Sequence, residues 1–454
     1  MIAPARVAAF EILSAVSAGR ADLSSAIARA RTSLRDDRDR ALAAEIATGV
    51  QRMRASLDHL IVQFSKRPLD RLDPEILEIL RLSIHQLLHL TRVPAAAVVD
   101  DAVNLAGRVG KRSAAGFVNA VLRNLARGRS SLPLPERPVD PANRARAIDY
   151  LSVTLSHPRW LAERWYERLG FGAAERWMQF NNRPAPLTLR ANRLRITPEN
   201  LRVRLASLDI AVAPGCYAPD ALIVESGHPL RGSAGDEGWF VVQDEASQLV
   251  ALLAGAHPGR RVLDTCASPG GKATAIAAAL DEDGRVVACD VRDRRIGLLR
   301  RTVKTTGATN VLLVQADLLS ALPFRAEFDT VIVDVPCSGL GTLRRDPDIR
   351  WRRQERELAA LAAAELRMLR HAAEVVSSGG RLVYATCSSE PEENEAVADA
   401  FLREAPEFAA VNAGQAHPAL PPAVVDDHGH LRTVPDRHGL EAFFGAVFER
   451  RRAG

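Results

Sequence analysis

The sequence predicts three domains: an all-α domain at residues 1–135, a small α+β domain at 142–255, and an α/β domain with parallel strands at 256–454. Apolar residues recur at helical spacing up to residue 127, and the proline-rich stretch 131–141 is typical of a linker. Buried-strand patterns then alternate with helical patterns in the C-terminal part. A chain of 454 residues is also too long for one ordinary core.

The N-terminal domain is predicted to be a bundle of helices. Its clearest helix begins after Asp73, a favourable N-cap residue, with Pro74 at the first helical position. The apolar residues that follow at three- and four-residue spacing are Ile76, Leu77, Leu80, Ile84 and Leu87. This spacing predicts an amphipathic helix that packs along one apolar stripe.

Positive charge is concentrated in the same domain. Residues 1–130 contain 20 Lys or Arg and 13 Asp or Glu, a net charge of +7, and the rest of the chain carries −2. A basic domain attached to a near-neutral one favours a polyanionic partner such as RNA, although a solvated helical surface would have the same composition.

The composition also bears on compartment and metal content. No apolar run approaches the roughly 20 residues that span a bilayer, and the N-terminus lacks a signal-peptide layout, so we expect a cytoplasmic protein without a membrane partner. The five cysteines include no C-x-x-C pair, and the histidines have no metal-ligand spacing. We therefore expect no metal and no disulfide framework.

Residues 328–339, FDTVIVDVPCSG, read as a buried parallel strand that ends before Pro336. Ligands of open α/β sheets bind beyond the carboxyl ends of the strands, where Asp334 and Cys337 stand. A lone buried cysteine is usually inert. A second one, Cys387, ends another strand of the same type, and we expect the two thiols to converge on one pocket.

Residues 261–290 read as a strand, loop, helix and strand. The glycine pair at 270–271 lets the backbone approach a ligand closely, just before a helix N-terminus. Cys266 and Ala273 stand where a Walker A loop has Gly and Ser or Thr, and no G-x-G-x-x-G is present, so a nucleoside triphosphate or dinucleotide is disfavoured. Asp290, at the end of the second strand, is suitably placed to bind ribose hydroxyls.

These stretches resemble the motifs of a known family. CASPGGK, ACD, QAD, DVPCSGLGTLRRDPDIRW and LVYATCSSEPEENE occur in the order typical of the RsmB-type RNA cytosine-5 methyltransferases, over residues 145–450. Residues 4–128 resemble the RNA-binding NusB family through LDPEILEILRLSIHQLLHL, VPAAAVVDDAVNLA and FVNAVLRNLAR. The chain departs from these patterns at His85, where an aromatic residue is usual, at Ser268, where Ala is usual, and at LEAFF, where DGFF is usual.

The resemblance implies a NusB-like helical domain, a small α+β middle domain and a Rossmann-like methyltransferase domain. It also implies that the enzyme transfers a methyl group from S-adenosylmethionine to carbon 5 of a cytosine in RNA, with 16S ribosomal RNA as the expected target and Cys387 as the nucleophile. The residues that it implies for cofactor binding are Cys266, Ala267, Ser268, Pro269, Gly270, Gly271, Lys272, Asp290, Asp317 and Asp334.

Chemical reasoning supports the same roles. Carbon 5 of cytosine is a poor nucleophile, but addition of the Cys387 thiolate to carbon 6 makes an enamine that can attack an electrophilic methyl group. Asp334 is expected to stabilise the charge that develops on the ring, and Cys337 to assist release of the enzyme. The target base must be single-stranded, looped or flipped to reach Cys387.

Two other functions stay open at this point: the same chemistry on tRNA, and a non-catalytic NusB-like RNA-binding factor. The presence of both Cys337 and Cys387 argues against the second. A solvated face or a grip on phosphates would explain the arginines after the Pro-Cys motif, which are Arg344, Arg345, Arg350, Arg352 and Arg353. The residues alone do not fix the methylated nucleotide, the oligomeric state or the role of LEAFF.

Overall fold

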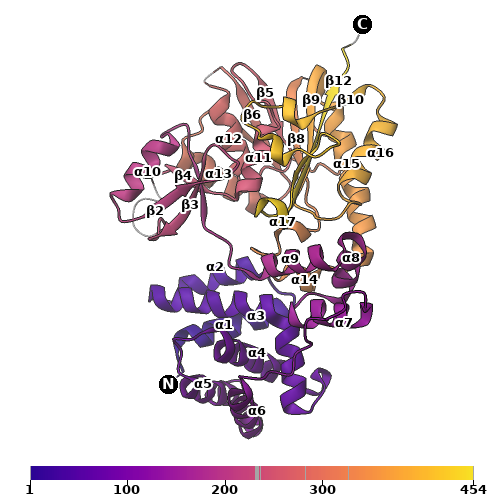
Figure 1. Cartoon of the computed structure of the whole chain (residues 1–454). Coiled ribbons are helices and arrows are strands. Elements are labelled where there is room, and N and C mark those ends of the chain that lie inside the picture. The colour runs from indigo at the N-terminus through magenta and orange to yellow at the C-terminus, as the bar shows by residue number, and fades with distance from the viewer. Residues whose placement is uncertain (1, 231–234, 236, 282, 326, 453–454) are drawn as a thin grey trace. The chain divides into compact units, whose positions relative to one another are not determined.

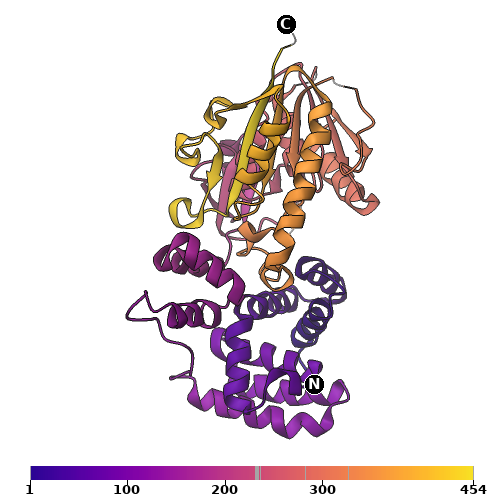
Figure 2. The ribbon, with the colours of Figure 1, turned by 90° about the vertical axis from the view of Figure 1, so that its right-hand side faces the viewer.

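The computed structural model describes residues 2–452 except 231–234, 236, 282 and 326. The chain forms two compact units, which are Met1–Pro184 with Leu343–Glu355, and Ala185–Thr342 with Arg356–Gly454. In its described residues the first unit is helical, and the second contains two sheets with helices around them (Figures 1 and 2). No helix among the described residues is long and apolar enough to cross a bilayer. The predicted combination of fold classes is confirmed.

The helices of the first unit follow the predicted N-terminal bundle and continue beyond it. They are α1 (Pro4–Ser17), α2 (Leu23–Ser33), α3 (Asp37–Ser65), α4 (Pro74–His89), α5 (Ala95–Arg108), α6 (Ala115–Gly128), α7 (Arg144–Asp149), α8 (Arg159–Leu169), α9 (Phe171–Asn182) and α14 (Ile349–Arg352). Helix α4 begins at Pro74 as predicted, but the Asp73 side chain caps nothing and instead pairs with Lys111 at 3.2 Å.

Helix α4 is not the one-sided amphipathic helix that its spacing predicts. Every residue from Glu78 to Gln86 is buried, because α1, α3, α5 and α6 all pack against it. Its polar residues have internal partners: Arg81 donates to Asp58 at 2.6 Å, and Gln86 accepts from Arg6 at 2.8 Å. These pairs allow charged side chains to occupy the centre of the bundle.

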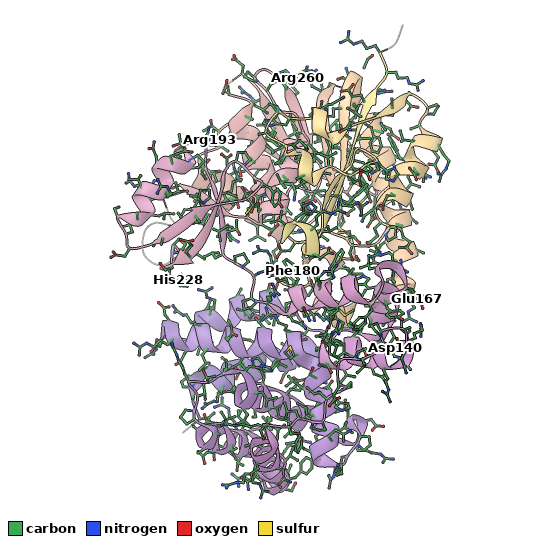
Figure 3. The ribbon with its side chains drawn as sticks, in the orientation of Figure 1. Asp140, Glu167, Phe180, Arg193, His228 and Arg260 are labelled. Carbon is green, nitrogen blue, oxygen red and sulfur yellow. The ribbon has the colours of Figure 1, made fainter. Side chains whose placement is uncertain are left out.

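The segment Leu343–Glu355 folds with the first unit although the sequence around it belongs to the second. Arg350 is completely buried and donates to the Ser156 carbonyl at 2.9 Å and the Leu343 carbonyl at 3.2 Å. Arg344 donates to the Pro184 carbonyl at 2.7 Å, and its guanidinium lies 4.4 Å from the ring centre of Phe180, which Figure 3 labels on α9.

The predicted arginine grip on phosphates is therefore wrong for Arg350. A fully buried guanidinium that is engaged by carbonyls cannot reach a phosphate. Arg352 is also engaged, because it pairs with Asp348 at 3.0 Å. The buried part of this arginine run holds the segment against the helical bundle.

The smaller sheet of the second unit is antiparallel, in the order β2-β3-β1-β4. Its strands are β1 (Thr188–Ala191), β2 (Ala211–Pro214), β3 (Ala221–Ser226) and β4 (Phe240–Val242), and α10 (Pro198–Ala206) packs on it through Leu201 and Leu205. The residues assigned by sequence to one middle domain are thus shared, since α7 to α9 lie in the first unit and these strands in the second. The three-domain division remains a prediction.

The larger sheet has the order β10-β12-β9-β8-β5-β6-β7, with β11 beside β12. Its strands are β5 (Arg261–Asp264), β6 (Arg285–Asp290), β7 (Val311–Gln315), β8 (Phe328–Asp334), β9 (Val376–Thr386), β10 (Phe408–Val411), β11 (Leu431–Thr433) and β12 (Phe443–Arg450). Strands β5 to β9 are parallel, and β10 to β12 pair antiparallel. The prediction of a buried parallel strand at β8 is confirmed.

Helices cover both faces of this sheet. They are α11 (Glu245–Leu252), α12 (Gly271–Ala279), α13 (Asp293–Thr306), α15 (Leu358–Glu374), α16 (Glu395–Glu404) and the short α17 (Pro435–His438). Alternate residues of β8 enter different cores: Ile332 packs with α11 and α12, whereas Val331 and Val333 pack with α15 and α16. This double burial explains the almost continuous apolar run of the strand.

Candidate active site

The order of the strands fixes where the site lies. Strands β5, β6 and β7 run outward in sequence order, and the chain then returns to place β8 on the other side of β5. In parallel sheets ligands bind outside the carboxyl ends of the strands at such a reversal. The last residues of these two neighbouring strands are carboxylates, Asp264 and Asp334.

A cavity of about 280 Å³ opens at this edge. Most of the residues expected to hold a cofactor line it, namely Cys266, Ala267, Ser268, Pro269, Gly271, Lys272 and Asp334. Other lining residues were not identified from the sequence, including Gln243, Ser247, Thr302 and Phe443. They come from elements without a recognisable motif, and only the aromatic pair at 443–444 offered a signal.

The glycine pair works as its sequence predicts. Gly270 has φ of 110°, a conformation that side chains rarely adopt, and an added Cβ would lie 2.9 Å from Leu299 Cδ1. Gly271 is the first residue of α12, and a Cβ there would lie 3.1 Å from Gln243 Cδ. The loop can therefore run close to the cavity and present the first amides of α12 to it.

Asp264 is the clearest sign that the cavity receives a ligand. Its carboxylate is 1% exposed, and neither oxygen has a hydrogen-bond partner among the described residues. Burial, with a further contribution from Asp334, raises the pKa of Asp264 to about 7. Such a carboxylate is costly to bury alone, and a cationic or hydrogen-bond-donating ligand would satisfy it.

Lys272 and Asp334 form an ion pair across the cavity, with Nζ 2.6 Å from Oδ2. Burial acts to lower the pKa of Lys272, but the Asp334 carboxylate outweighs it and the pKa is raised. The negative form of Cys387 contributes in the same direction, so Lys272 lies within electrostatic reach of that thiol.

The two predicted thiols do approach each other, although neither of them lines the cofactor cavity. Cys387 directly follows β9, Cys337 lies three residues beyond β8, and their sulfur atoms are 3.3 Å apart. Cys337 is buried, whereas Cys387 is partly exposed. The hydrogen bond with Cys387, followed by burial, raises the pKa of Cys337, so Cys337 stays a thiol at neutral pH.

A buried carboxylate, Glu393, holds both cysteine loops. It accepts the N–H of Ser338 at 2.6 Å and the hydroxyl of Ser388, and these serines directly follow Cys337 and Cys387. The serine hydroxyls are also 3.1 Å apart. The sequence reasoning missed this arrangement, because acidic residues in a turn usually look solvated.

A second buried carboxyl group, Glu365 on α15, lies beneath this arrangement. Burial raises its pKa to about 10, with nearby Cys337 and Glu393 adding to the effect. Glu365 is thus a neutral acid at pH 7 and accepts from the Tyr384 hydroxyl at 3.1 Å. The groups near the Glu393 side chain, namely the protonated Glu365 and the Tyr384 hydroxyl, are thus uncharged.

The other predicted cofactor residues lie at neighbouring strand ends. Asp290 ends β6, is buried, and accepts the Ser268 N–H at 3.3 Å while Arg295 lies 3.5 Å away. It therefore shapes the cofactor loop. Asp317 follows β7, is exposed, and accepts the Leu319 N–H at 2.9 Å. Neither aspartate lines the cavity, and their cofactor roles remain predictions.

The LEAFF segment (residues 440–444) has a defined place. The Ala442 N–H donates to the Gly341 carbonyl at 3.0 Å, and the Gly341 N–H donates to the Cys387 carbonyl at 2.9 Å. Phe443 lines the cavity, with its ring centre 6.0 Å from Lys272 Nζ. The segment thus closes one wall beside the loop that carries Cys387.

Comparison with known proteins agrees with this geometry. Residues 251–449 match the model of the 16S rRNA methyltransferase RsmB/F family, residues 3–127 match the NusB family, and residues 157–231 match the RsmF/B-like ferredoxin-like domain. The fold and the site thus define a methyltransferase joined to a NusB-like region.

Relatives match along nearly the whole chain. The ribosomal RNA small subunit methyltransferase B of Pseudomonas putida is 34% identical over 88% of this chain and 89% of its own length. The ribosomal RNA small subunit methyltransferase B of Vibrio cholerae is 31% identical over 94% of this chain and 93% of its own length. The crystal structure of PH0851 superimposes with a TM-score of 0.82 at 25% sequence identity and covers 99% of each chain. A methyltransferase homologue from Pyrococcus horikoshii superimposes with a TM-score of 0.57 at 25% identity and covers 69% of this chain and 100% of its own. This chain belongs to the RsmB/F family of S-adenosylmethionine-dependent rRNA methyltransferases.

Proposed function

We propose that the enzyme methylates carbon 5 of a cytosine in 16S ribosomal RNA through a covalent adduct between Cys387 and the base. The observation that carries the proposal is the pair of sulfur atoms 3.3 Å apart, on the loops that follow the parallel strands β8 and β9. The family description supports 16S rRNA as the target. The net charge of +7 on residues 1–130 supports RNA binding by the helical region.

The cavity residues fit S-adenosylmethionine. The unpartnered Asp264 carboxylate suits a cationic ligand, and the loop from Cys266 to Lys272 presents backbone amides at the start of α12. When bound, S-adenosylmethionine supplies an electrophilic methyl group. Asp290 would contribute hydrogen bonds and hold Ser268 of the loop in place.

The chain's own residues would then act in sequence on the base. The Cys387 thiolate forms a bond from sulfur to carbon 6. Asp334, in its protonated form, would donate a hydrogen bond to the ring nitrogen and stabilise the negative charge that develops on the ring. After methylation the proton of carbon 5 passes to solvent water, and the electron pair of that C–H bond re-forms the double bond between carbons 5 and 6 as the bond from sulfur to carbon 6 breaks and returns the Cys387 thiolate. Cys337, as a thiol 3.3 Å away, can donate a hydrogen bond to the departing Cys387 thiolate.

The two cysteines predict different mutant phenotypes. With labelled RNA on a denaturing gel, Cys337→Ala should accumulate a slow-migrating adduct, because attack is intact and release is impaired. Cys387→Ala should form neither adduct nor product. The assay requires a reducing agent, because two thiols this close can oxidise. The opposite pattern would exchange the roles, and an absence of adduct in both mutants would contradict release by Cys337.

Bisulfite mapping of RNA from a deletion strain tests the reaction and its target together. Loss of one protected cytosine in 16S rRNA, restored by the wild-type gene, is the expected result. Loss in tRNA instead would favour the alternative substrate, and no change anywhere would favour a non-catalytic RNA-binding factor.

A further inference from the structure

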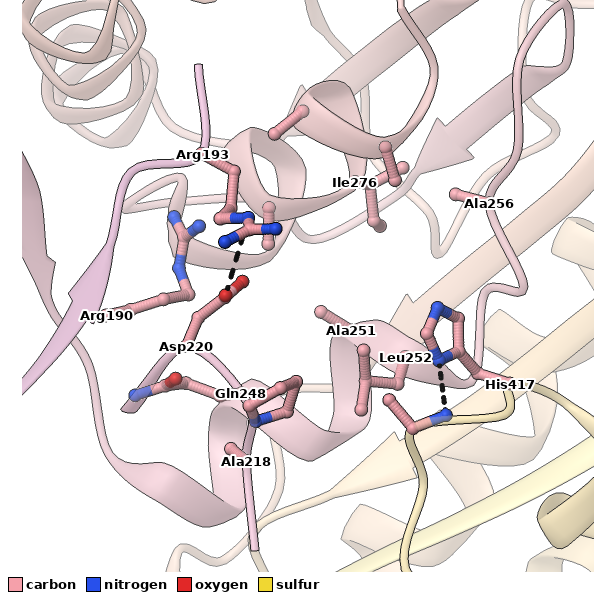
Figure 4. A pocket seen from close by; sticks show the side chains of 15 residues that line it. Arg190, Arg193, Ala218, Asp220, Gln248, Ala251, Leu252, Ala256, Ile276 and His417 are labelled. Carbon is pink, nitrogen blue, oxygen red and sulfur yellow. Dashed lines mark hydrogen bonds and ion pairs between the residues drawn. The ribbon is translucent and has the colours of Figure 1, made fainter. Parts of the chain in front are cut away.

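A second cavity, of about 400 Å³, lies in the same unit and shares no lining residue with the cofactor cavity. Figure 4 shows it between α11, α12 and the turn before β3, with His417 at its edge. Its volume is within the range of small-molecule sites. The proposed methyl transfer uses none of its residues.

One wall of the cavity is apolar and built largely from small side chains. The residues that form it include Ala251, Leu252, Ala256, Ala275 and Ile276. Alanines on two helices leave a shallow surface that a flat ring can approach closely. The wall therefore suits a heteroaromatic body better than a branched aliphatic one.

Two buried polar atoms on the opposite side lack a hydrogen-bond partner among the described residues. Arg190 is 2% exposed, and its Nη1 has no hydrogen-bond acceptor among the described residues. Gln248 is 4% exposed, and its Oε1 likewise has no donor in the part of the chain that the structure describes. Both residues line the cavity. A ligand that satisfied them would present one acceptor and one donor.

Charged groups complete the polar side. Arg193 lies 3.7 Å from Asp220, as the dashed line in Figure 4 shows. His417 Nδ1 accepts the Ala419 N–H at 3.0 Å, so the neutral ring carries its proton on Nε2 and can donate. Arg190 and Arg193 bring two positive charges to the cavity, and Asp220 brings one negative charge. The net charge of the lining is therefore positive, which favours an anionic ligand.

We propose that this cavity binds a nucleotide, with the base against the alanine wall, its donor and acceptor edge at Gln248 and Arg190, and the phosphate near Arg193. A base has adjacent donors and acceptors on a flat ring, and a phosphate supplies the anion. The nucleotide can be free in solution or part of an RNA chain. The site is separate from the proposed reaction and does not depend on it.

Substitutions that test the site must leave Arg190 intact. Arg190 Nη2 donates to Thr274 Oγ1 at 2.9 Å and its Nε to Gln243 Oε1 at 2.8 Å, so it also supports α12 and the cofactor cavity. Arg193 is about half exposed and Ala278 lines the cavity from α12. Arg193→Ala removes charge, and Ala278→Leu fills space.

The test is calorimetric titration of the full chain, saturated with S-adenosylhomocysteine, with each of the four nucleoside 5′-monophosphates. At least one of the monophosphates should bind. Arg193→Ala should lower its affinity about tenfold, and Ala278→Leu should abolish its binding. The matched controls Arg202→Ala and Ala206→Leu, on the exposed part of α10, should leave it unchanged. No binding by any monophosphate, or binding that survives both cavity variants, would overturn the proposal.

A competition arm identifies the source of the nucleotide. If a single-stranded oligoribonucleotide displaces the bound monophosphate, and Arg193→Ala also lowers the affinity for the oligonucleotide, the site takes a nucleotide of an RNA chain. If the monophosphate stays bound, the site takes free nucleotides. The readout is independent of methylation, so an inactive enzyme could still confirm the site.

Discussion

The Glu393 carboxylate accepts the backbone N–H of Ser338 at 2.6 Å across 55 positions of sequence. The same carboxylate accepts the hydroxyl of Ser388, so one buried anion ties together the loops that carry the two cysteines. We infer that Glu393 is a positioning residue, which sets the sulfur separation of 3.3 Å through the two serines.

Replacing Glu393 should impair catalysis more than binding. Glu393→Gln keeps the shape but converts one acceptor into a donor, which conflicts with the Ser338 amide. A displacement of the thiols by a fraction of an ångström should lower kcat about tenfold to hundredfold. The affinity for S-adenosylhomocysteine should change little, because Glu393 does not line the cofactor cavity.

The control is Glu404→Gln, which removes a surface carboxylate paired with Arg370. It should leave kcat unchanged. Ser388→Ala removes one of the hydrogen bonds to Glu393 and should give an intermediate kcat. If Glu393→Gln lowered only the melting temperature and left kcat per folded molecule intact, the residue would be structural and not positioning.

Gly341 should tolerate no side chain. An added Cβ would lie 2.1 Å from the Ala442 carbonyl oxygen and 2.7 Å from that of Cys387, so one of these backbones must move. Gly341→Ala should therefore displace the loop that carries Cys387 and abolish most methyl transfer. Gly116→Ala on α6 is the matched control, because its Cβ would meet nothing within 4 Å. That control should be neutral or stabilise the helix by about 0.5–1 kcal/mol.

Local patterns account for what the sequence predicted correctly. The apolar run of β8, the glycine pair and the two strand-end cysteines are each contained in a few consecutive residues, and parallel strands bring their carboxyl ends to one edge. Glu393 and Phe443 could not be predicted, because their roles depend on contacts with distant segments. The all-round burial of α4 was hidden for the same reason, since Arg81 looks solvated until its partner Asp58 is in place.

Arg350 shows the same limit and allows a direct test. Its guanidinium donates to the carbonyls of Ser156 and Leu343 and to Asn182 Oδ1 at 3.0 Å, and it has no carboxylate partner in the part of the chain that the structure describes. Arg350→Ala leaves these buried acceptors unpaired and should lower the free energy of unfolding by about 3 kcal/mol. The measurement is urea unfolding of the full chain.

The exposed neighbour Arg356 provides the control for this prediction. Arg356→Ala should leave the urea midpoint unchanged. If Arg350 gripped phosphate instead, Arg350→Ala would weaken RNA binding with unaltered stability, and the salt dependence of RNA binding would become shallower.

Asp290 should matter for the cofactor in two ways. It is expected to bind the ribose, and it fixes Ser268 of the cofactor loop. Asp290→Ala should weaken S-adenosylhomocysteine binding by about 1.5–3 kcal/mol, the value of charge-assisted hydrogen bonds. Asp293→Ala, three residues along at the exposed start of α13, is the control. Unchanged affinity in calorimetry would remove Asp290 from the site.

His85, the departure from the NusB-type pattern, predicts how stability depends on pH. Its ring is 3% exposed and lies in the space beside Gly49, and neither ring nitrogen has a hydrogen-bond partner among the described residues. Burial, with smaller contributions from His89 and Arg52, lowers the pKa of His85 to about 3. The folded state therefore keeps this histidine neutral through the acidic range.

The unfolded chain protonates the same histidine near pH 6.5, so its contribution to stability is complete above that pH and is lost as the pH falls toward 3. Between pH 7.5 and 5.0 this amounts to about 2 kcal/mol. His85→Phe removes the titrating ring and restores the aromatic residue usual in NusB relatives. The free energy of unfolding of His85→Phe relative to that of the wild type, measured by urea unfolding, should rise by about that amount as the pH is lowered from 7.5 to 5.0. A difference that stayed constant with pH would mean that His85 is not held neutral in the folded bundle.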